Sequence, residues 1–289
     1  MSTSDSHREQ PSTYFVQDRS NQDELTRIQV HDQLATIAQG GVLAEQPHPE
    51  NFQQVLDVGC GTGGWLIETA KTYPGISRLE GVDISQKIID FARAQAVVQQ
   101  VSERVSFHVM DALRMLEFPN DSFDLVNQRS GAGYLRKWDW PKLLQEYLRV
   151  TRPGGLIRIT EGDWAVESNS PALTRLFHLL LAAFYQAGHS FAATSDGVTS
   201  ELGSLLHQFG LQHVQTQRHP RENRAGTPDG QLFIEDMKLV FRTTVPFLRK
   251  WIALPDDYED LYQQMLRETQ RPDFVARGSM LTAWGTKPE

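Results

Sequence analysis

The chain has 289 residues, 39% of them hydrophobic, and its 28 lysines and arginines against 36 aspartates and glutamates give a formal charge of −8. This acidic balance argues against general binding to nucleic-acid phosphates, which needs a basic surface. A single cysteine, Cys60, excludes an internal disulfide, and the longest apolar run, 179–185, is far shorter than the ~20 residues that cross a membrane. We therefore expect a cytoplasmic chain whose partners include neither nucleic acid nor a membrane.

A polar tail and a helix come first in the predicted order of elements. The first ~20 residues are polar, and apolar spacing in 23–41 predicts a helix that Gly40 and Gly41 end. After a polar connector, strands alternate with helices. The expected strands cover residues 53–59, 78–85, 104–112, 122–130 and 155–164, and the helices among them cover 63–74, 85–100 and 139–150.

The alternation of strands and helices predicts right-handed crossovers, and hence an α/β fold with a doubly wound, mostly parallel sheet. After Trp164 the pattern becomes mainly helical. Helices are expected at 170–188, 199–210, 233–255, with a kink at Pro246, and 255–269, and strands at 211–217 and 280–288. We divide the chain into an N-terminal tail and helix (1–45), an α/β core (46–164), and remaining strands with helical insertions (165–289).

Ligands of such sheets bind at the carboxyl ends of the strands, so the residues that end each strand form the candidate site. The first strand leads into VLDVGCGTGGW, residues 55–65, which fits two cofactors. Gly59, Gly61 and Gly64 have the G-x-G-x-x-G spacing of a dinucleotide fold. Asp57 and the loop that follows it resemble instead the glycine loop of enzymes that use S-adenosylmethionine (SAM).

Two aspartates test these alternatives. Asp83 ends the second strand, where a carboxylate accepts hydrogen bonds from the ribose hydroxyls of either cofactor. Asp57 precedes the glycines, where its charge is unfavourable beside the pyrophosphate of NAD but suits the ammonium group of a bound amino acid. Asp57 therefore favours SAM.

Four motifs in a fixed order support the same cofactor. They are VLDVGCGTGGW at 55–65, GVDIS at 81–85, VMDALRMLEFPNDSFDLVNQRS at 109–130 and LRVTRPGGLIRITE at 148–161. With the closing strand AWGTKP, they resemble the class I SAM-dependent methyltransferases that act on small molecules. The resemblance implies a Rossmann-like, seven-stranded sheet with a helical lid, SAM as the cofactor and S-adenosylhomocysteine (SAH) as the product.

The resemblance also implies a set of cofactor contacts. These are Tyr14, Asp57, Gly59, Cys60, Gly61, Gly63, Asp83, Ile84, Asp111, Ala112, Asn127 and Gln128. The glycines let the backbone approach the methionine part of SAM, and Asp83 binds the ribose. Asp111 and the Ala112 amide bind the adenine. Asn127 and Gln128 face the amino-acid end of SAM or the reacting centre.

The predicted N-terminal helix adds to this resemblance. ELTRIQVHDQL, residues 24–34, is similar to an E-x-x-R-L/I-x-x-Q-x-x-L helix that folds over SAM in some small-molecule methyltransferases. His31 occupies the position of the glutamine. The resemblance implies that this helix closes the cofactor pocket together with Tyr14.

Residues at and beyond the ends of the fourth and fifth strands predict the acceptor side. Glu161 and His178 are the candidate catalytic groups, since a general base is needed where the acceptor loses a proton. The candidate substrate contacts are Arg129, Tyr134, Asp163 and Trp164. Arg129 would pair with the SAM carboxylate or with an acidic substrate. The later helices would form a lid with apolar walls, so we expect a small, partly apolar acceptor.

The reaction and assembly stay open at this point. N-, O- and C-methylation are equally compatible with the motifs, and no spacing of histidines and carboxylates predicts a metal. The alternatives are a SAM-binding fold with a non-methylating activity, as a cyclase, isomerase or binding protein, and an NAD(P)-dependent oxidoreductase, which Asp57 disfavours. We expect a small-molecule substrate and a monomer or homodimer.

Overall fold

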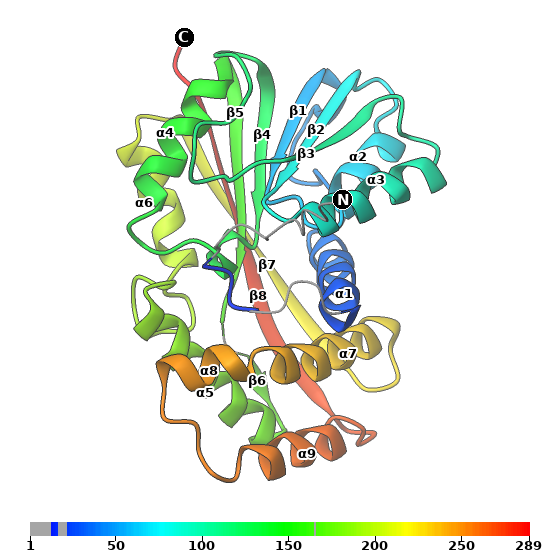
Figure 1. The fold of residues 1–289 in the computed structure, drawn as a ribbon, viewed down its shortest axis with the longest axis vertical. Helices are drawn as coiled ribbons and strands as arrows, with labels where there is room; N and C mark the ends of the chain where they lie inside the picture. The colour runs from blue at the N-terminus through cyan, green and yellow to red at the C-terminus, as the bar shows by residue number, and fades with distance from the viewer. Residues whose placement is uncertain (1–12, 17–21, 165) are drawn as a thin grey trace, which may run out of the picture.

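The computed structural model describes residues 13–16, 22–164 and 166–289. Its centre is one eight-stranded sheet in the order β3-β2-β1-β4-β5-β8-β6, with β7 also paired to β8 (Figure 1). The strands are β1 (Gln54–Val58), β2 (Arg78–Asp83), β3 (Val105–Val109), β4 (Phe123–Arg129), β5 (Thr151–Gly162), β6 (Glu167–Ser168), β7 (Gln212–Arg224) and β8 (Val275–Thr286). Neighbours among β1 to β5 are parallel, and β8 is antiparallel to β5, so the predicted doubly wound, mostly parallel sheet is confirmed. The strand beyond the seven expected is β6, which has two residues.

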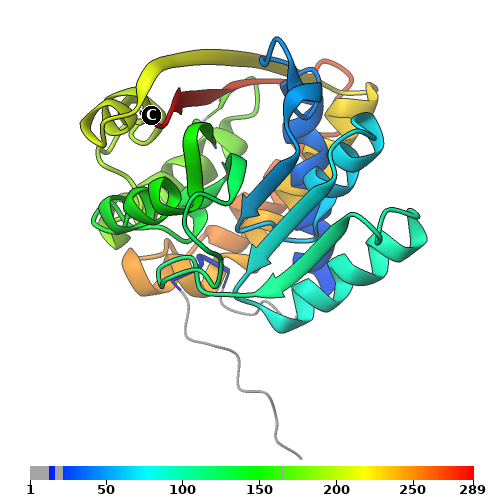
Figure 2. The same ribbon diagram turned by 90° about the horizontal axis from the view of Figure 1, so that it is seen from above.

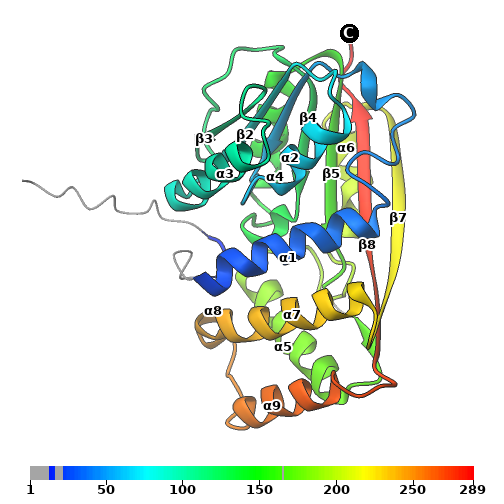
Figure 3. The same cartoon turned by 90° about the vertical axis from the view of Figure 1, so that its right-hand side faces the viewer.

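Helices form two groups around this sheet. The first group packs on the α/β core and contains α2 (Gly64–Thr72), α3 (Gln86–Val98), α4 (Trp140–Val150) and α6 (Leu202–Gln208). The second group lies beyond the carboxyl ends of the parallel strands and contains α5 (Pro171–Ala187), α7 (Pro228–Thr243), α8 (Val245–Trp251) and α9 (Tyr258–Glu268). Helix α1 (Gln22–Ala38) lies between the two groups (Figure 3). Short 3₁₀ helices occur at Pro49–Asn51, Gly131–Gly133 and Thr199–Glu201.

The central strands bury both of their faces. Helices cover both faces of the sheet (Figure 2). Val55 and Leu125 pack in one apolar core with α2 and α3, whereas Leu56 and Val126, the next residues along, pack in another with α4 and α6. Successive side chains of a strand point to opposite faces, so a strand covered on both sides must be apolar throughout. This is why the sequence predicts these strands as buried.

Strands β7 and β8 join the two groups of helices. They pair from Gln212 with Thr286 to Arg224 with Val275, and so continue beside the second group of helices (Figure 1). The strand expected at 211–217 covers only the first part of β7. The rest was not predicted, because most β7 side chains are exposed and show no apolar alternation. Pairing with β8 therefore determines the length of β7.

One predicted helix is divided in two. The kinked helix expected at 233–255 is α7 and α8, which separate at Thr244, close to Pro246. Helix α7 also begins earlier than expected, where Thr227 Oγ1 accepts a hydrogen bond from the Gly230 amide at 3.1 Å. Within the described ranges, no helix combines the length and apolar character needed to cross a bilayer.

Candidate active site

A cavity of about 400 Å³ lies at the carboxyl ends of the parallel strands, and residues of α1, α5 and α7 cover it. Most of the residues predicted from the sequence line it. They are Tyr14, Asp57, Gly59, Cys60, Gly61, Asp83, Ile84, Asp111, Ala112, Arg129, Tyr134, Glu161, Asp163 and Trp164. Four predicted residues, all in the described part of the chain, lie outside its wall: Gly63, Asn127, Gln128 and His178.

The glycine loop reaches the cavity at Gly59 and Gly61. Their φ angles are +70° and +54°, a region that L side chains rarely adopt. A Cβ atom on Gly59 would lie 2.7 Å from the Tyr134 hydroxyl, so a side chain there would collide with the opposite wall. Gly63 of the same loop is not part of the wall, and a Cβ atom there would meet the Phe107 ring at 2.5 Å. Gly63 thus allows the loop to pack against β3 and does not face the cavity.

Two aspartates at strand ends are oriented by backbone amides. Asp83 Oδ2 accepts from the Gly61 amide at 3.2 Å, and Asp83 Oδ1 accepts from the Ser85 amide at 2.9 Å. Asp111 Oδ1 accepts from the Leu113 amide at 2.9 Å. These local bonds hold both carboxyl groups in the cavity wall, at the ends of the neighbouring strands β2 and β3.

A buried chain of side chains supports Asp57. Asn127 Nδ2 donates to Asp57 Oδ1 at 2.7 Å, and Arg158 Nη1 donates to Asn127 Oδ1 at 2.7 Å. Arg158 is itself fully buried and paired with Glu45 at 2.6 Å. The predicted cofactor contact of Asn127 is therefore corrected, because this fully buried side chain lies behind Asp57. Burial raises the pKa of Asp57 to about 7, although the nearby charge of Arg129 opposes the shift.

Glu161 is supported in a similar way by Gln128. Gln128 Nε2 donates to Glu161 Oε1 at 3.2 Å, and the Tyr147 hydroxyl donates to Gln128 Oε1 at 2.6 Å. Gln128 has no exposed surface, so its predicted cofactor contact is corrected too. Burial raises the pKa of Glu161 to about 8, although the amides of Ala132 and Gly131 oppose the shift. The Glu161 carboxyl is therefore mainly protonated at neutral pH.

Two predicted substrate contacts already have partners of opposite charge. Arg129 forms an ion pair with Asp32. Asp163 accepts a hydrogen bond from Arg218 Nη1 at 2.8 Å. Both residues line the cavity, but their charges are balanced within the protein.

Tyr134 and Trp164 form an aromatic part of the wall. The Trp164 ring packs on Phe184 with the ring centroids 4.0 Å apart. Both polar groups, the Tyr134 hydroxyl and Trp164 Nε1, are buried; the Tyr134 hydroxyl lies beside that of Tyr147, and Trp164 Nε1 has no hydrogen-bond partner in the described part of the chain. Buried polar groups are rarely left unpaired, so Trp164 Nε1 is a candidate for contact with a ligand.

His178 lies away from the site. It is exposed on α5, whereas Phe177 and Leu180 of the same helix line the cavity. One residue turns an α-helix by about 100°, so His178 follows Phe177 onto the outer side. The catalytic role predicted for His178 is corrected to that of a surface residue.

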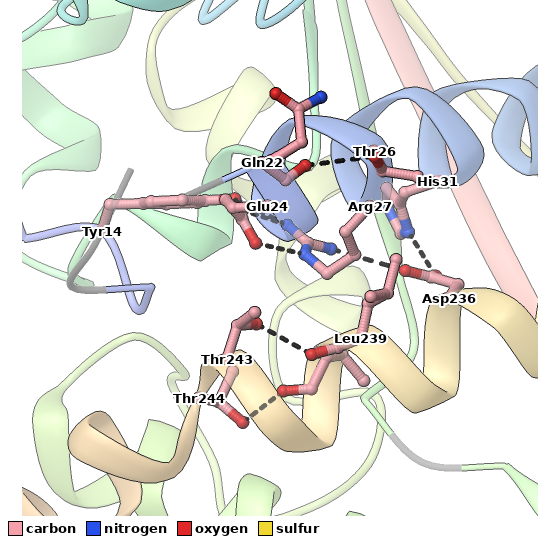
Figure 4. Close-up of polar contacts among 11 residues, drawn as sticks. Tyr14, Gln22, Glu24, Thr26, Arg27, His31, Asp236, Leu239, Thr243 and Thr244 are labelled. Atoms are coloured by element: carbon pink, nitrogen blue, oxygen red, sulfur yellow. Dashed lines mark hydrogen bonds and ion pairs between the residues drawn. The ribbon is translucent and has the colours of Figure 1, made fainter. Parts of the chain in front are cut away.

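Helix α1 is attached over the cavity by a buried polar cluster (Figure 4). The Tyr14 hydroxyl donates to Glu24 Oε1 at 2.6 Å, and Arg27 donates to both of these residues. On the side of α7, Asp236 lies 3.1 Å from His31 Nδ1 and 3.6 Å from Arg27 Nη1. We call these five residues the clasp, because they join the segment at residue 14, α1 and α7.

Part of the wall was not predicted from the sequence. The missed residues include Arg221 on β7, Asp236, Met237 and Val240 on α7, and Met280 on β8. A signal existed only for Asp236, a carboxylate within the otherwise apolar side of a predicted helix. Arg221 belongs to the polar run RHPRENR, which resembles any exposed strand.

Neither a metal nor a thiol nucleophile fits this wall. Within the described ranges, no group of three or more histidine, cysteine or acidic side chains is arranged to hold a metal ion. Burial raises the pKa of the Cys60 thiol, so this side chain is not a thiolate at neutral pH. The wall does suit SAM, because carboxyl groups end three adjacent strands and the glycine loop lines the cavity at Gly59 and Gly61.

Comparison with known proteins identifies the family. Residues 55–155 match a family described as a methyltransferase domain. The demethylmenaquinone methyltransferase of Lactiplantibacillus plantarum is 30% identical over 187 residues, which are 60% of this chain and 76% of that protein. The chain belongs to the class I SAM-dependent methyltransferases. SAM is therefore the cofactor of this methyltransferase, and the NAD alternative is excluded.

Two solved structures share the fold of this methyltransferase. Phosphoethanolamine N-methyltransferase 2 of Haemonchus contortus, in complex with phosphomonomethylethanolamine and SAH, has a TM-score of 0.55 and 18% identity, over 95% of this chain and 60% of that one. The 4+2 cyclase SpnF has a TM-score of 0.52 and 17% identity, over 97% of this chain and 99% of that one. At such identities the similarity shows the fold alone.

Proposed function

We propose that this methyltransferase acts on a small, partly apolar acceptor bound in the cavity between the strand ends and helices α5 and α7. The observation that carries the proposal is one continuous cavity with acidic groups at one end and an apolar wall at the other. The acidic end is formed by Asp57, Asp83 and Asp111, and the apolar wall by Phe177, Leu180, Met237 and Val240.

The acidic end is the proposed place of the cofactor. We assign Asp57 to the ammonium group of SAM, Asp83 to the ribose hydroxyls, and Asp111 with the Ala112 amide to the adenine. The amide bonds to Asp83 and Asp111 and the Asn127 bond to Asp57 support these roles, because they hold the carboxyl groups in place before the ligand binds. SAM supplies a methyl group on a positively charged sulfur.

Glu161 is the residue that we assign to the acceptor. It lines the same cavity, and its carboxyl is hydrogen-bonded to Gln128 and the Ala132 amide without a cationic partner among the described residues. The neutral carboxyl can donate a hydrogen bond to the acceptor, and the ionised form can take its proton. The positive charge of SAM would favour the ionised form.

Titration calorimetry with SAM, SAH and NADH tests the cofactor assignment. We expect micromolar binding of SAM and SAH and none of NADH. Binding of NADH alone would contradict the assignment. Release of SAH from SAM, measured with a panel of small aromatic and aliphatic amines, phenols and acids, tests methyl transfer itself.

A second candidate is a SAM-binding protein with a non-methylating activity, because the cyclase SpnF shares this fold. The two functions differ in what happens to the cofactor. A methyltransferase releases one SAH for each product molecule, whereas a cyclase or isomerase forms its product with SAM unchanged. Quantifying SAH and product in the same reaction therefore separates them.

A further inference from the structure

We propose that the methyl acceptor carries a carboxylate or another anionic oxygen group, and that Arg221 binds this group inside the cavity. The inference rests on the proposed function and names its substrate class. The acceptor would then have an apolar body and one negatively charged end.

The charges of the cavity wall single out Arg221. Three arginines line the cavity, and two have anionic partners: Arg27 pairs with Glu24 at 2.8 Å, and Arg129 pairs with Asp32. No hydrogen bond or ion pair joins the Arg221 side chain to any other residue in the described ranges, and its Nε is buried without a partner. The side chain as a whole is partly exposed, but a buried N–H donor is rarely left unpaired, so Nε points to a ligand that completes it.

The acidic residues nearest to Arg221 are engaged elsewhere. Asp236 lies between His31 and Arg27 in the clasp (Figure 4). Asp163 bonds Arg218. Their charges act on Arg221 from beyond ion-pair distance, and burial still lowers the pKa of its guanidinium. Asp236 and Asp163 therefore offset the charge of Arg221 only in part, and no residue in the described ranges forms an ion pair with it.

The position of Arg221 separates it from the cofactor end. It lies on β7, on the far side of β8 and β5 from strands β2 and β3, which carry Asp83 and Asp111. Its cross-strand neighbour is Gly278, where a Cβ atom would lie 3.9 Å from Arg221 Nε and 3.1 Å from Val166. The lack of a side chain at Gly278 lets the apolar Val166 of the cavity wall pack beside the guanidinium. This geometry suits the charged end of an apolar molecule.

The anion would reach Arg221 from the main cavity. Arg221 also lines a smaller hollow of about 230 Å³ beside α1, but that hollow contains Glu222 and Asp229. The acceptor must also lie beside the cofactor, and of these two spaces only the main cavity is lined both by Arg221 and by the residues assigned to SAM.

Matched probes on the SAH-bound protein test the charge of the acceptor. We would compare 4-phenylbutyrate with the neutral 4-phenylbutyramide by calorimetry, because the two share shape and apolar body. We expect the acid to bind at least about 10-fold more tightly, as one charge-assisted contact predicts. Arg221→Gln should remove this difference in affinity between the acid and the amide. Arg224→Gln, at an exposed arginine of the same strand that pairs with Glu222, should preserve it.

Thermal melting of Arg221→Met gives a second readout that needs neither probe nor turnover. If Arg221 has no partner within the protein, removing its charge should raise Tm, by about 2 °C. A comparable fall in Tm would show that Arg221 supports the fold and would overturn the proposal. The acid binding no better than the amide, or preference for the acid surviving Arg221→Gln, would also overturn it. A protein that binds SAH but never forms it would contradict the proposed function alone.

Discussion

Asp57 and Glu161 illustrate how the partners of a buried acid tune its charge. Burial raises both pKa values, to about 7 for Asp57 and to about 8 for Glu161. Asp57 lies near Arg129 and accepts a bond from Asn127, and both favour its ionised form. Glu161 has amide donors alone. The acid proposed to meet the ammonium of SAM is thus the more easily ionised of the two.

Glu161→Gln should lower turnover and change its pH dependence. The ionised carboxyl takes a proton from the acceptor, so we expect wild-type turnover to rise with pH. It should level off below about 8, the pKa of Glu161 without SAM, because the charge of SAM lowers this pKa. The amide cannot take a proton, and turnover should fall by about 100-fold and lose this rise. SAH release measured across the pH range checks both effects. A variant that keeps the alkaline rise would show that another group titrates.

Asp83→Ala should weaken the binding of SAM. Removing the carboxylate leaves ribose hydroxyls without a buried partner, so we expect a loss of about 1 to 3 kcal/mol in binding free energy. Calorimetry with SAM measures the loss. Asp90→Ala, at an exposed aspartate on α3, is the matched control and should bind SAM normally. Unchanged affinity in folded Asp83→Ala protein would remove the ribose assignment.

The sequence predicted which strand ends meet at the site more reliably than which side chain of each end faces the cavity. Asp57, Asp83 and Asp111 line the cavity as expected, because a parallel strand delivers its last residues to one edge of the sheet. Asn127 and Gln128 end β4 as well, but successive side chains point to opposite faces, and each found a buried partner behind the cavity. Which polar end residue faces the ligand depends on neighbours distant in sequence.

At the scale of elements, the clasp determines how α1 sits over the cavity. Burial alone would raise the pKa of Asp236, but the bond from His31 and the charges of His31 and Arg27 lower it. The ionised Asp236 thus holds two residues of α1 against α7. Because both helices cover the cavity, loosening the clasp should also expose the bound cofactor.

Asp236→Asn should loosen α1. The substitution removes the charge that Arg27 and His31 share, and we expect a loss of about 1 to 3 kcal/mol in the free energy of unfolding. SAH should also dissociate faster, because its cover opens more often. Chemical denaturation and stopped-flow release of SAH measure the two effects. Glu235→Gln, at the neighbouring partly exposed residue, should change neither appreciably, since exposed ion pairs contribute little.

An element could be predicted where the sequence pattern that specifies it lies within the element itself. Helices α1, α5 and α9 were expected close to their observed positions, because apolar spacing and terminal residues lie within each segment. The two-residue β6 and the second half of β7 exist because β8 lies beside them, far along the chain. No pattern within those segments could have shown this pairing.

At the scale of the whole molecule, the cavity forms where three apolar cores meet. Two cores lie on opposite faces of the sheet, and the third contains α5, α7, α8 and α9. Strands β7 and β8 extend from the sheet to the third core. Helix α1 lies between the two groups of helices and contacts α2 and α7 (Figure 3). Residues from all these parts line one cavity, so its acids are buried only when the whole chain is folded. Their ionisation is consequently linked to global stability.

The stability of the apo protein should therefore fall as pH rises from about 6.5 to about 8.5. In this range unfolded Glu161 is ionised, whereas folded Glu161, with its pKa raised to about 8, still binds a proton, so folding takes up a proton. Asp57, with its pKa raised to about 7, adds to this loss of stability in the lower part of the pH range. Below this range His189 makes the stability rise with pH. Burial lowers its pKa to about 4 in the folded protein, so the unfolded chain binds more protons there.

Glu161→Gln isolates the contribution of one acid. We expect the wild type to lose about 1 to 2 kcal/mol more than Glu161→Gln between those two pH values, because the amide does not titrate. Urea denaturation at each pH measures the difference. Glu117→Gln, at an exposed glutamate, should follow the wild type. If Glu161→Gln lost as much stability as the wild type, Glu161 would be ionised in the folded apo protein, and its raised pKa would be wrong.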